Sequence, residues 1–171
     1  KVLSPEAIQG LDVLVNLAGE RIDKRWTKAN KKLFWDSRVG ETAKIASMVS
    51  SLEADLRPRV WLNTSAVGIY GDGGEIELIE SVVGEPGYMV RLCEEWEKAA
   101  HKESLQPCRV VHPRVGVVFG RNAAAWKKMH SLFSWGLGGR LGSGQQWFPW
   151  VHIDDVVGAY VFLSSTEGVE G

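Results

Sequence analysis

Two apolar stretches of the sequence each end in small residues, an ending that leaves room for a ligand. Leu17-Ala18-Gly19 closes the first stretch, and Thr64-Ser65-Ala66 closes the second. Open parallel sheets bind ligands at the carboxyl ends of their strands, and small residues there let a flat ring or a ribose approach the backbone closely. Many α/β domains end their strands in this way, so the residues alone leave both a binding cleft and an ordinary strand end open.

A second group of polar residues lies near the end of the chain. His152 stands close to Asp154 and Asp155, an arrangement that could relay a proton. We instead interpret Asp154-Asp155, and Asp155 in particular, as a helix cap, and His152 as a packed residue beside a glycine-rich segment. The two cysteines, Cys93 and Cys108, form no Cys-x-x-Cys pair and have no metal-like spacing to the four histidines. We therefore expect reduced, structural thiols and no metal site.

The elements that must position these residues begin with a strand, a helix and a strand. The apolar run at 12–17 is typical of a strand buried on both faces. A helix is predicted from about Lys28 to Leu52, because apolar residues recur at spacings of three and four. Residues 60–63 form the next predicted strand. This order predicts a βαβ crossover in a mostly parallel sheet.

The second half of the sequence repeats that order. Helices are predicted at 90–102, 122–135 and 156–163, and β-rich segments at 109–112 and 115–119. Pro113 separates the two β-rich segments, and proline cannot donate to a ladder, so we expect a break or a sheet edge there. Gly136 to Gly144 contains five glycines in nine residues, which predicts a shaped loop.

The composition is that of a globular domain without a charged binding face. The chain has 171 residues, of which 44% are hydrophobic and 24% charged, and its net charge is −1. We therefore expect no nucleic-acid partner and no anionic-membrane partner. No stretch reaches the roughly 20 apolar residues that span a bilayer. Eight tryptophans are present, and they fit either core packing or the aromatic rim of a substrate cleft.

Four sequence elements resemble those of the extended short-chain dehydrogenases/reductases. Asn16-Leu17-Ala18-Gly19 resembles the element after their fourth strand, and the segment 64–71 resembles the strand-five signature in which Ser is followed by Tyr-Gly. The segment 114–120 is similar to their strand-six element, and 150–156 to their late Val-His-Val-Asp-Asp-Val box. The four elements occur in the family's order at compatible spacings and cover about residues 10 to 165.

Further motifs resemble an atypical branch of that family, the "epimerase family" proteins. These motifs are Asn16 to Glu20, Ser37-Arg38, Leu92-Cys93 with Trp96-Glu97, and the segment 137–146. The branch contains proteins described as sugar-nucleotide-epimerase-like or cell-division-inhibitor-like, in bacteria, animals and plant plastids. The resemblance implies an α/β fold, a Rossmann-like doubly wound parallel sheet, and a cytoplasmic protein, or a plastid protein in a plant.

The family's Gly-rich phosphate turn does not occur in this sequence. By analogy, we expect residues 1–171 to be the central part of a single NAD(P)-binding domain. The N-terminal βαβ unit, with the residue that selects NAD or NADP, would precede it, and a C-terminal part would follow it. The loop at about 136–150 would lie on the substrate side. Extended reductases often dimerise through two long helices, and 28–52 and 90–102 are the candidates for a homodimer.

The family's catalytic pair is altered in this sequence. Reductases of this fold use Tyr and Lys four residues apart on one helix face, and the Lys lowers the pKa of the Tyr. Here the alignment places Gly87 where the Tyr belongs, whereas Tyr88 lies three residues before Arg91. Tyr88 and Arg91 could act as a pair, or Tyr88 could cap the helix while Arg91 is a solvated or ribose-facing cation. Ser65 would bind a substrate carbonyl or hydroxyl, or else bond the local backbone.

The cofactor-binding residues that the resemblance implies are Leu17, Ala18, Gly19, Arg38, Val117 and Val118. Arg38 could approach the cofactor phosphates or a 2′-phosphate, which makes NADP(H) the expected cofactor rather than NAD(H). Its alternative is a surface ion pair with Asp36 or Glu41. The expected activity is NAD(P)-dependent oxidoreduction or epimerisation of a secondary alcohol or carbonyl in a small-molecule substrate, such as a nucleotide sugar. The alternative is an NADP(H)-binding regulatory or division-associated protein with little or no catalysis.

Overall fold

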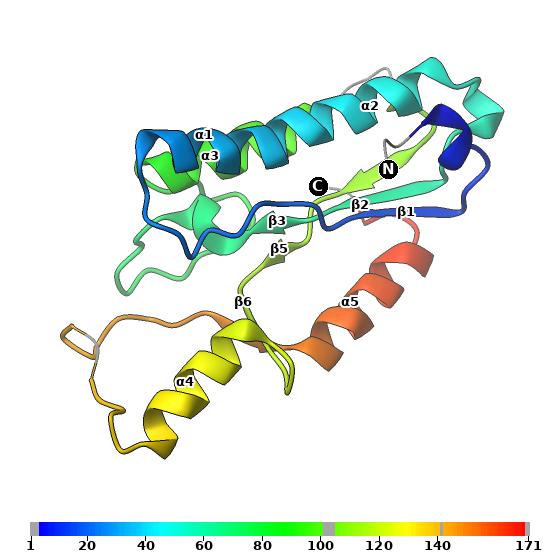
Figure 1. Cartoon of the computed structure of the whole chain (residues 1–171). Helices are drawn as coiled ribbons and strands as arrows, with labels where there is room; N and C mark the ends of the chain where they lie inside the picture. Colours follow the sequence, from blue (N-terminus) through cyan, green and yellow to red (C-terminus); the bar gives the residue numbers. More distant parts are fainter. Residues whose placement is uncertain (1–3, 101–104, 141, 170–171) are drawn as a thin grey trace.

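A computed structural model describes residues 4–100, 105–140 and 142–169, in which parallel strands alternate with helices (Figure 1). Three small sheets form, in the orders β1-β2-β4, β3-β5 and β6-β7, and every pairing is parallel. The strands are β1 (Val13–Asn16), β2 (Val60–Asn63), β3 (Ser65–Ala66), β4 (Arg109–Val111), β5 (Arg114–Val115), β6 (Val117–Phe119) and β7 (Trp150–His152).

The first two sheets share one interrupted strand pairing. Leu62 pairs with Val111 in β2 and β4, and Ser65 pairs with Arg114 in β3 and β5, with the same offset between the two strands. The interruption follows the proline, as predicted, because Pro113 has no N–H to donate to the ladder. Its carbonyl still accepts a hydrogen bond from the Ser65 backbone N–H at 2.8 Å. The short strands β3 and β5 thereby carry the pairing up to the candidate site.

The predicted long helix is present and contains a wider turn. α1 (Lys28–Trp35) passes through the π-helical turn η2 (Asp36–Gly40) into α2 (Glu41–Ser51) without a gap. The Thr27 side chain caps the start, where its Oγ1 accepts from the Asn30 backbone N–H at 3.2 Å. The prediction of helix over 28–52 is confirmed, although nothing in the pattern indicated the π-turn. Such turns occur frequently at functional sites.

Helices cover both faces of the sheet, and the core therefore has two halves. Trp61 on β2 packs in one hydrophobic cluster with Ile45 and Val49 of α2. Val60 and Leu62 point the opposite way and pack with residues of the C-terminal helix. Figure 1 shows α2 and α3 (Tyr88–Ala100) on one side of the sheet and α5 (Ile153–Ser165) on the other. The predicted doubly wound, Rossmann-like α/β fold is confirmed. The predicted end of α3, at Lys102, lies outside the described residues.

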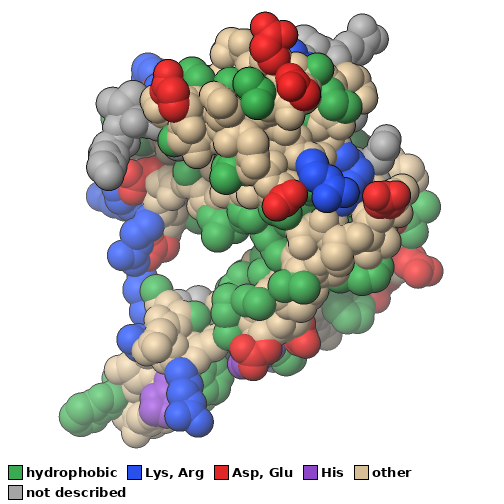
Figure 2. All heavy atoms as spheres, turned by 90° about the vertical axis from the view of Figure 1, so that its right-hand side faces the viewer, with side chains coloured by type: hydrophobic (Ala, Val, Ile, Leu, Met, Phe, Trp, Pro, Cys, Tyr) green, Lys and Arg blue, Asp and Glu red, His purple; other side chains and the backbone are tan. Residues whose placement is uncertain are grey.

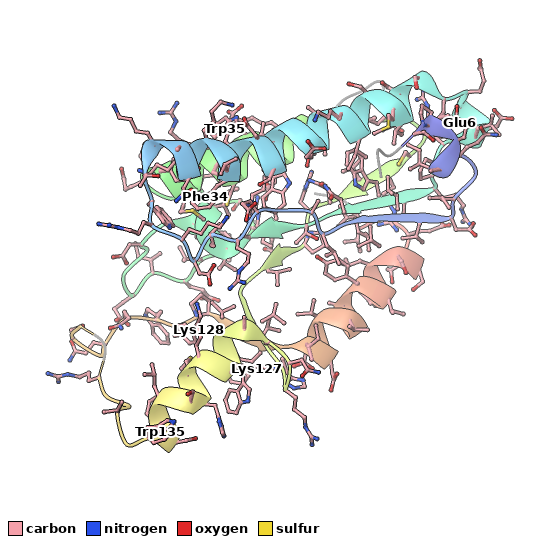
Figure 3. The ribbon with its side chains drawn as sticks, viewed as in Figure 1. Glu6, Phe34, Trp35, Lys127, Lys128 and Trp135 are labelled. Carbon is pink, nitrogen blue, oxygen red and sulfur yellow. The ribbon has the colours of Figure 1, made fainter. Side chains whose placement is uncertain are left out.

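The C-terminal half contains α4 (Ala124–Ser134), the loop at 136–149 and α5. Gly136 has φ +68° directly after α4, a left-handed conformation that favours glycine at a helix end. Lys128 on α4, labelled in Figure 3, forms an ion pair with Asp23 in the segment after β1, with an N–O distance of 2.8 Å. Short 3₁₀ turns complete the described elements: η1 (Pro5–Ala7), η3 (Ala54–Leu56) and η4 (Val67–Tyr70).

Two predictions for the start of α5 are wrong. The cap is His152, whose Nδ1 accepts from the Asp154 backbone N–H at 3.3 Å, and its side chain is exposed rather than packed. The helix begins at Ile153, which is earlier than the pattern predicted. Asp154 and Asp155 consequently lie in the first turn, where negative charge still interacts favourably with the helix dipole.

The surface around α5 is rich in apolar side chains. Figure 2 looks onto the right-hand side of Figure 1 and shows hydrophobic side chains gathered around this helix. Val157, Val161 and Phe162 of α5 are all exposed. Among the described helices, none is both long and apolar enough to cross a membrane. Over the same residues, no three His, Cys, Asp or Glu side chains gather in a way that could hold a metal ion.

Candidate functional site

The π-turn fixes the segment that leaves β1. Ser37 Oγ accepts a hydrogen bond from the Glu20 backbone N–H at 2.9 Å, and Arg38 Nη1 donates to the Glu20 carbonyl at 3.0 Å. At the start of the same segment, Asn16 Oδ1 accepts from the Ala18 backbone N–H at 3.1 Å. Leu17-Ala18-Gly19 is therefore held at both ends, as a fixed wall at the carboxyl edge of the sheet.

A buried polar network lies behind this wall. Thr42 Oγ1 accepts from Asn16 Nδ2 at 3.2 Å and from Trp96 Nε1 at 3.0 Å, and it donates to Asn63 Oδ1 at 3.3 Å. Asn16 Nδ2 also donates to Asn63 Oδ1 at 2.7 Å. Asn16 and Asn63 end two adjacent strands, and Thr42 and Trp96 come from two helices. Because every member is paired, the network joins four elements at the site and restricts their movement.

A cavity of about 230 Å³ opens in front of the wall. Its walls come from the ends of β1 and β3, the π-turn, α3 and the β5–β6 junction. The lining residues are Leu17, Ala18, Gly19, Ile22, Arg38, Thr64, Ser65, Ala66, Met89, Leu92, Cys93, Trp96, Val115 and Gly116. Five of the predicted site residues, Leu17, Ala18, Gly19, Arg38 and Ser65, thus meet in one place.

Arg38 contributes a mostly buried cation to this cavity. Its guanidinium lies over the Trp96 ring, 5.3 Å from the centroid, and a Cβ added to Gly19 would come within 3.0 Å of it. Burial lowers the pKa of Arg38, which nevertheless stays charged at neutral pH. The alternative surface pairings are not formed, because Asp36 pairs with Lys32 and Glu41 with Lys44.

Ser65 contributes a hydroxyl. The residue is 1% exposed, and its Oγ has no hydrogen-bond partner at normal distance. A buried polar group without a partner costs free energy, so such a hydroxyl indicates an unmet binding role. Cys93 lies on the same cavity, and burial raises the pKa of its thiol to about 11. The thiol is therefore neutral at physiological pH and does not serve as a nucleophile there.

Tyr88 and Arg91 lie together in a different hollow. Both line a surface depression with Trp35, Pro86 and Gly87, and neither lines the cavity that contains Ser65. The Tyr88 hydroxyl donates to the Lys31 carbonyl at 2.6 Å. Burial raises the pKa of Tyr88, against a smaller opposing effect of Arg38, which is the reverse of what an activated catalytic phenol requires. The described geometry does not bring this pair to Ser65.

The face of α3 that does line the cavity carries other residues. Met89, Cys93 and Trp96 follow one another at helical spacing along it. No sequence pattern indicated Met89, since the alignment placed the catalytic positions one or two residues away. The segment 114–120 also contributes other residues than predicted. Val115 and Gly116 line the cavity, whereas Val117 and Val118 pair with β7.

A second cavity of about 840 Å³ adjoins the first across β3 and η4. One wall is the segment 70–78, and the other is formed by Ser143, Gln145, Gln146, Trp147 and Pro149. The predicted substrate-side loop at 136–150 therefore borders a cavity, through the residues that follow its glycines. Its Leu141 lies outside the described residues. Trp147 lines this cavity and Trp96 lines the first, while Trp61 packs in the core; the role of tryptophans in a substrate cleft stays a prediction.

Comparison with known protein families identifies the family of this chain. The model of the NAD dependent epimerase/dehydratase family matches residues 4–171. The chain belongs to this family. Its predicted membership of the extended short-chain dehydrogenases/reductases, in the epimerase-family branch, is thereby confirmed.

Relatives of this chain are described as epimerase family proteins. The chloroplastic "Epimerase family protein SDR39U1 homolog" of Arabidopsis thaliana is 39% identical over 150 residues, which are 88% of this chain and 43% of that protein. An epimerase family protein of Mycobacterium tuberculosis is 35% identical over 168 residues, 98% of this chain and 54% of that protein. The chain thus spans about half the length of the curated relatives it matches.

Solved structures of epimerase-family proteins have the same fold. Human epimerase family protein SDR39U1 (isoform 2), crystallised with NADPH, superposes with a TM-score of 0.84 and 34% identity over 94% of this chain and 55% of that chain. A nucleoside-diphosphate sugar epimerase from Corynebacterium glutamicum gives 0.80 and 29%, over 98% of this chain and 35% of that chain. UDP-glucuronic acid 4-epimerase from Bacillus cereus, at 18% identity and a TM-score of 0.73, supports the fold alone.

Proposed function

We propose that this chain supplies the nicotinamide side of an NADP(H)-dependent oxidoreductase or epimerase-like enzyme that acts on a secondary alcohol or carbonyl. The observation that carries the proposal is the Ser65 hydroxyl, buried without a partner on a cavity at the carboxyl edge of a parallel sheet. A ligand oxygen at that point would satisfy it. The substrate is a small molecule, and a nucleotide sugar is the candidate class because the C. glutamicum relative is described as a nucleoside-diphosphate sugar epimerase.

The cavity residues fit a nicotinamide cofactor in both shape and charge. Ala18 and Gly19 leave the backbone accessible to a ribose or a flat ring. Arg38 supplies a fixed positive charge that can interact with a phosphate or ribose oxygen. A nicotinamide cofactor would supply hydride transfer in this site. The choice of NADP(H) is supported by the human relative, which was crystallised with NADPH.

The protein's own residues have separate tasks in this proposal. Ser65 binds and orients the oxygen of the substrate alcohol or carbonyl. Arg38 holds the cofactor side of the cavity, and the clamped Leu17-Ala18-Gly19 segment excludes water from one face. The larger cavity beside β3, bordered by Trp147, receives the remainder of the substrate. Tyr88 and Arg91 have no part in it.

A second candidate is an NADP(H)-binding regulatory or division-associated protein with little turnover. The position of Tyr88 favours it, because a phenol that is bonded to the Lys31 carbonyl supplies no proton at Ser65. The two candidates share the cofactor and differ in the chemistry. Two single variants, Tyr88→Phe and Ser65→Ala, separate the two candidates. An enzyme with turnover loses activity in Ser65→Ala, whereas a regulatory protein has no activity to lose.

The cofactor is tested by titrating the full-length protein with NADPH and NADH while following nicotinamide fluorescence. We expect NADPH to bind, and Arg38→Met to weaken binding about tenfold, because a hydrogen bond to a charged group contributes about 1.5 kcal/mol. Arg91→Met is the matched control, since Arg91 is an exposed arginine outside the cavity. No binding of either nucleotide at millimolar concentration would refute the proposal, and equal effects of the two arginine variants would refute the role of Arg38.

A further inference from the structure

One thiol on the smaller cavity has no task in the proposed function. Cys93 of α3 is buried, and it lines the cavity of about 230 Å³ together with Ser65 and Met89. A Cβ added to Gly68 of η4 would lie 3.2 Å from Met89 Cε and 3.5 Å from Cys93 Sγ. Both side chains therefore extend from α3 toward η4, beside the end of β3. The thiol thus lines the same space as the Ser65 hydroxyl, which is buried without a partner.

Three other polar side chains on this cavity are already hydrogen-bonded or cannot be deprotonated. Trp96 Nε1 donates to the Thr42 hydroxyl at 3.0 Å. The Thr64 hydroxyl is hydrogen-bonded to that of Tyr160 at 2.6 Å. Arg38 keeps its charge in proteins at any working pH. These three groups are therefore not available to protonate a ligand.

Ser65 and Cys93 remain as proton-bearing side chains among the described residues that line the cavity. Both can donate a hydrogen bond, but serine is not among the side chains that titrate in proteins, whereas cysteine is. A serine hydroxyl can thus orient a ligand oxygen, and a thiol can also release its proton. The cavity therefore contains one side chain suited to hold an oxygen and one suited to protonate it.

Glu97, which lies one turn beyond Cys93 on α3, is not an alternative donor. Arg114 of β5 donates two hydrogen bonds to its carboxylate, from Nε at 3.0 Å and from Nη2 at 2.9 Å. Burial raises the pKa of Glu97, but the effects that oppose burial, led by the hydrogen bonds from Arg114, hold the pKa below its ordinary value. Glu97 is consequently ionised at neutral pH, and it does not line the cavity.

We propose that Cys93 is the catalytic proton donor of this site in the reduction of a carbonyl group. As the carbonyl carbon gains a hydride, the π electrons of the C=O bond move to the oxygen. This oxygen forms an O–H bond with the proton that leaves Cys93 Sγ, while Ser65 donates a hydrogen bond to the same oxygen. The thiolate then takes a proton from water, which restores the thiol. The inference rests on the proposed function for the source of the hydride.

The surroundings of Cys93 suit this task. Burial raises the pKa of the thiol to about 11, and Glu97 adds to this effect, whereas Arg38 is the largest of the opposing effects. The thiol therefore holds its proton at neutral pH until a base forms beside it. An alkoxide is a stronger base than a thiolate with this pKa, so proton transfer toward the alcohol is favourable. Arg38, on the same cavity, stabilises the thiolate until it is reprotonated.

The position of the thiol is tested by alkylating the full-length protein with iodoacetamide and measuring the label on each cysteine by mass spectrometry. NADPH at about ten times its Kd should slow the labelling of Cys93 about tenfold, because only the unoccupied cavity admits the reagent. Cys108 is the matched control: it is also buried, burial raises its pKa to about 11, and it packs in the core without lining this cavity. Labelling of Cys93 that bound NADPH does not slow, or slows no more than that of Cys108, would overturn the inference.

The chemical role of the thiol is tested by following NADPH oxidation with cyclohexanone and benzaldehyde as carbonyl probes. Cys93→Ala should lower kcat about 100-fold, as the loss of a general acid does, and should still bind NADPH. Cys93→Ser keeps the shape of the side chain and should also lower kcat, because serine does not titrate. Cys108→Ala should keep the kcat of the unmodified protein.

Two results of this second test would contradict the role of Cys93. One is an undiminished kcat in either Cys93 variant, and the other is NADPH binding by the unmodified protein without turnover of either probe. Absence of NADPH binding would instead reject the proposed function itself.

Discussion

Thr42 is the residue on which most of the site's internal support depends. Its hydroxyl joins the ends of β1 and β2 to α2 and α3 through the side chains of Asn16, Asn63 and Trp96. Threonine and valine have nearly the same shape, but valine offers no hydrogen bond. The substitution therefore tests the network without opening a cavity.

We expect Thr42→Val to lower the free energy of unfolding by about 2 kcal/mol or more, because it leaves the buried Trp96 and Asn63 groups short of a partner. Urea denaturation followed by tryptophan fluorescence measures the change. Ser47→Ala is the control, since Ser47 is an exposed hydroxyl on the same helix and should change stability by less than about 0.5 kcal/mol. A loss no larger than that of the control would show that the network adds little to stability.

Glu97 makes stability depend on pH. Its folded pKa lies below the ordinary value of 4.5, so its contribution is present above that pH and is lost as the pH falls through the folded value. Glu97→Gln should cost about 2 kcal/mol at pH 7, in line with hydrogen bonds to charged groups. The cost should shrink as the pH falls below 4.5.

Thermal unfolding across the pH range measures this dependence. Glu41→Gln provides the comparison, because its pair with Lys44 is exposed and should add little stability at neutral pH. A cost of Glu97→Gln that stays constant down to pH 2 would contradict the assignment of the pH dependence to this carboxylate.

At the scale of elements, two glycines have opposite requirements. Gly116 separates β5 from β6, and a Cβ there would lie 2.3 Å from the Pro149 carbonyl oxygen, which accepts the Val117 backbone N–H. Gly158 lies inside α5 with nothing within 4 Å of the same added atom. One position demands the absence of a side chain, and the other tolerates a side chain.

Alanine at these two glycines should therefore change stability in opposite directions. Gly116→Ala should destabilise the protein by about 2 kcal/mol through overpacking against backbone. Gly158→Ala should stabilise it by about 1 kcal/mol, because alanine has the higher helix propensity. Thermal unfolding of the two variants gives the signs directly, and two changes of the same sign would disprove this difference between them.

The sequence was informative where a local pattern determines structure. The apolar runs at β1 and β2 and the helical spacing through Val49 predicted the βαβ unit, and Pro113 predicted the strand interruption. The π-turn was not predictable, because Asp36–Gly40 fits an ordinary helix equally well. The histidine cap of α5 was missed because aspartate is the commoner cap residue and stood two residues further on.

The part of the candidate site that depends on local sequence patterns was also predicted. Strand ends are local features, so Ala18, Gly19 and Ser65 could be named from the sequence. The Glu97–Arg114 pair joins a helix to a strand, and only the tertiary fold brings them together. The orientation of α3 also depends on packing: Met89 faces the cavity and Tyr88, its neighbour, faces α1. A shift of one residue along a helix turns a side chain by about 100°.

At the scale of the whole molecule, the apolar surface is unevenly distributed. Val161 and Phe162 on α5 are more than half exposed, and so is Leu17 after β1. Among the described strands, β1 pairs with β2 alone, which leaves its other edge open. Large exposed apolar patches mark surfaces that associate with other protein. The homodimer predicted through the long helices stays a prediction.

We expect the 171-residue chain to self-associate through the exposed apolar side chains of α5 as its concentration rises. Replacing both Val161 and Phe162 by Lys should shift the chain toward monomer in sedimentation velocity experiments, since two charges would have to be desolvated in any contact. Ser47→Lys, on the outer side of α2, is the control and should leave the distribution unchanged. Self-association that persists in the double variant and disappears in the control would point to the long helices instead.

The π-turn at Asp36–Gly40 makes the cleft sensitive to chain length as well as to residue type. Deleting one residue there, such as Val39, would convert the turn to regular α-helix and rotate α1 by about 100° relative to α2. Phe34, which points from α1 toward the protein interior (Figure 3), would leave the core, and Ser37 would leave Glu20. A deletion of three nucleotides at this position would therefore open the wall of the cavity while every lining residue remained in the sequence.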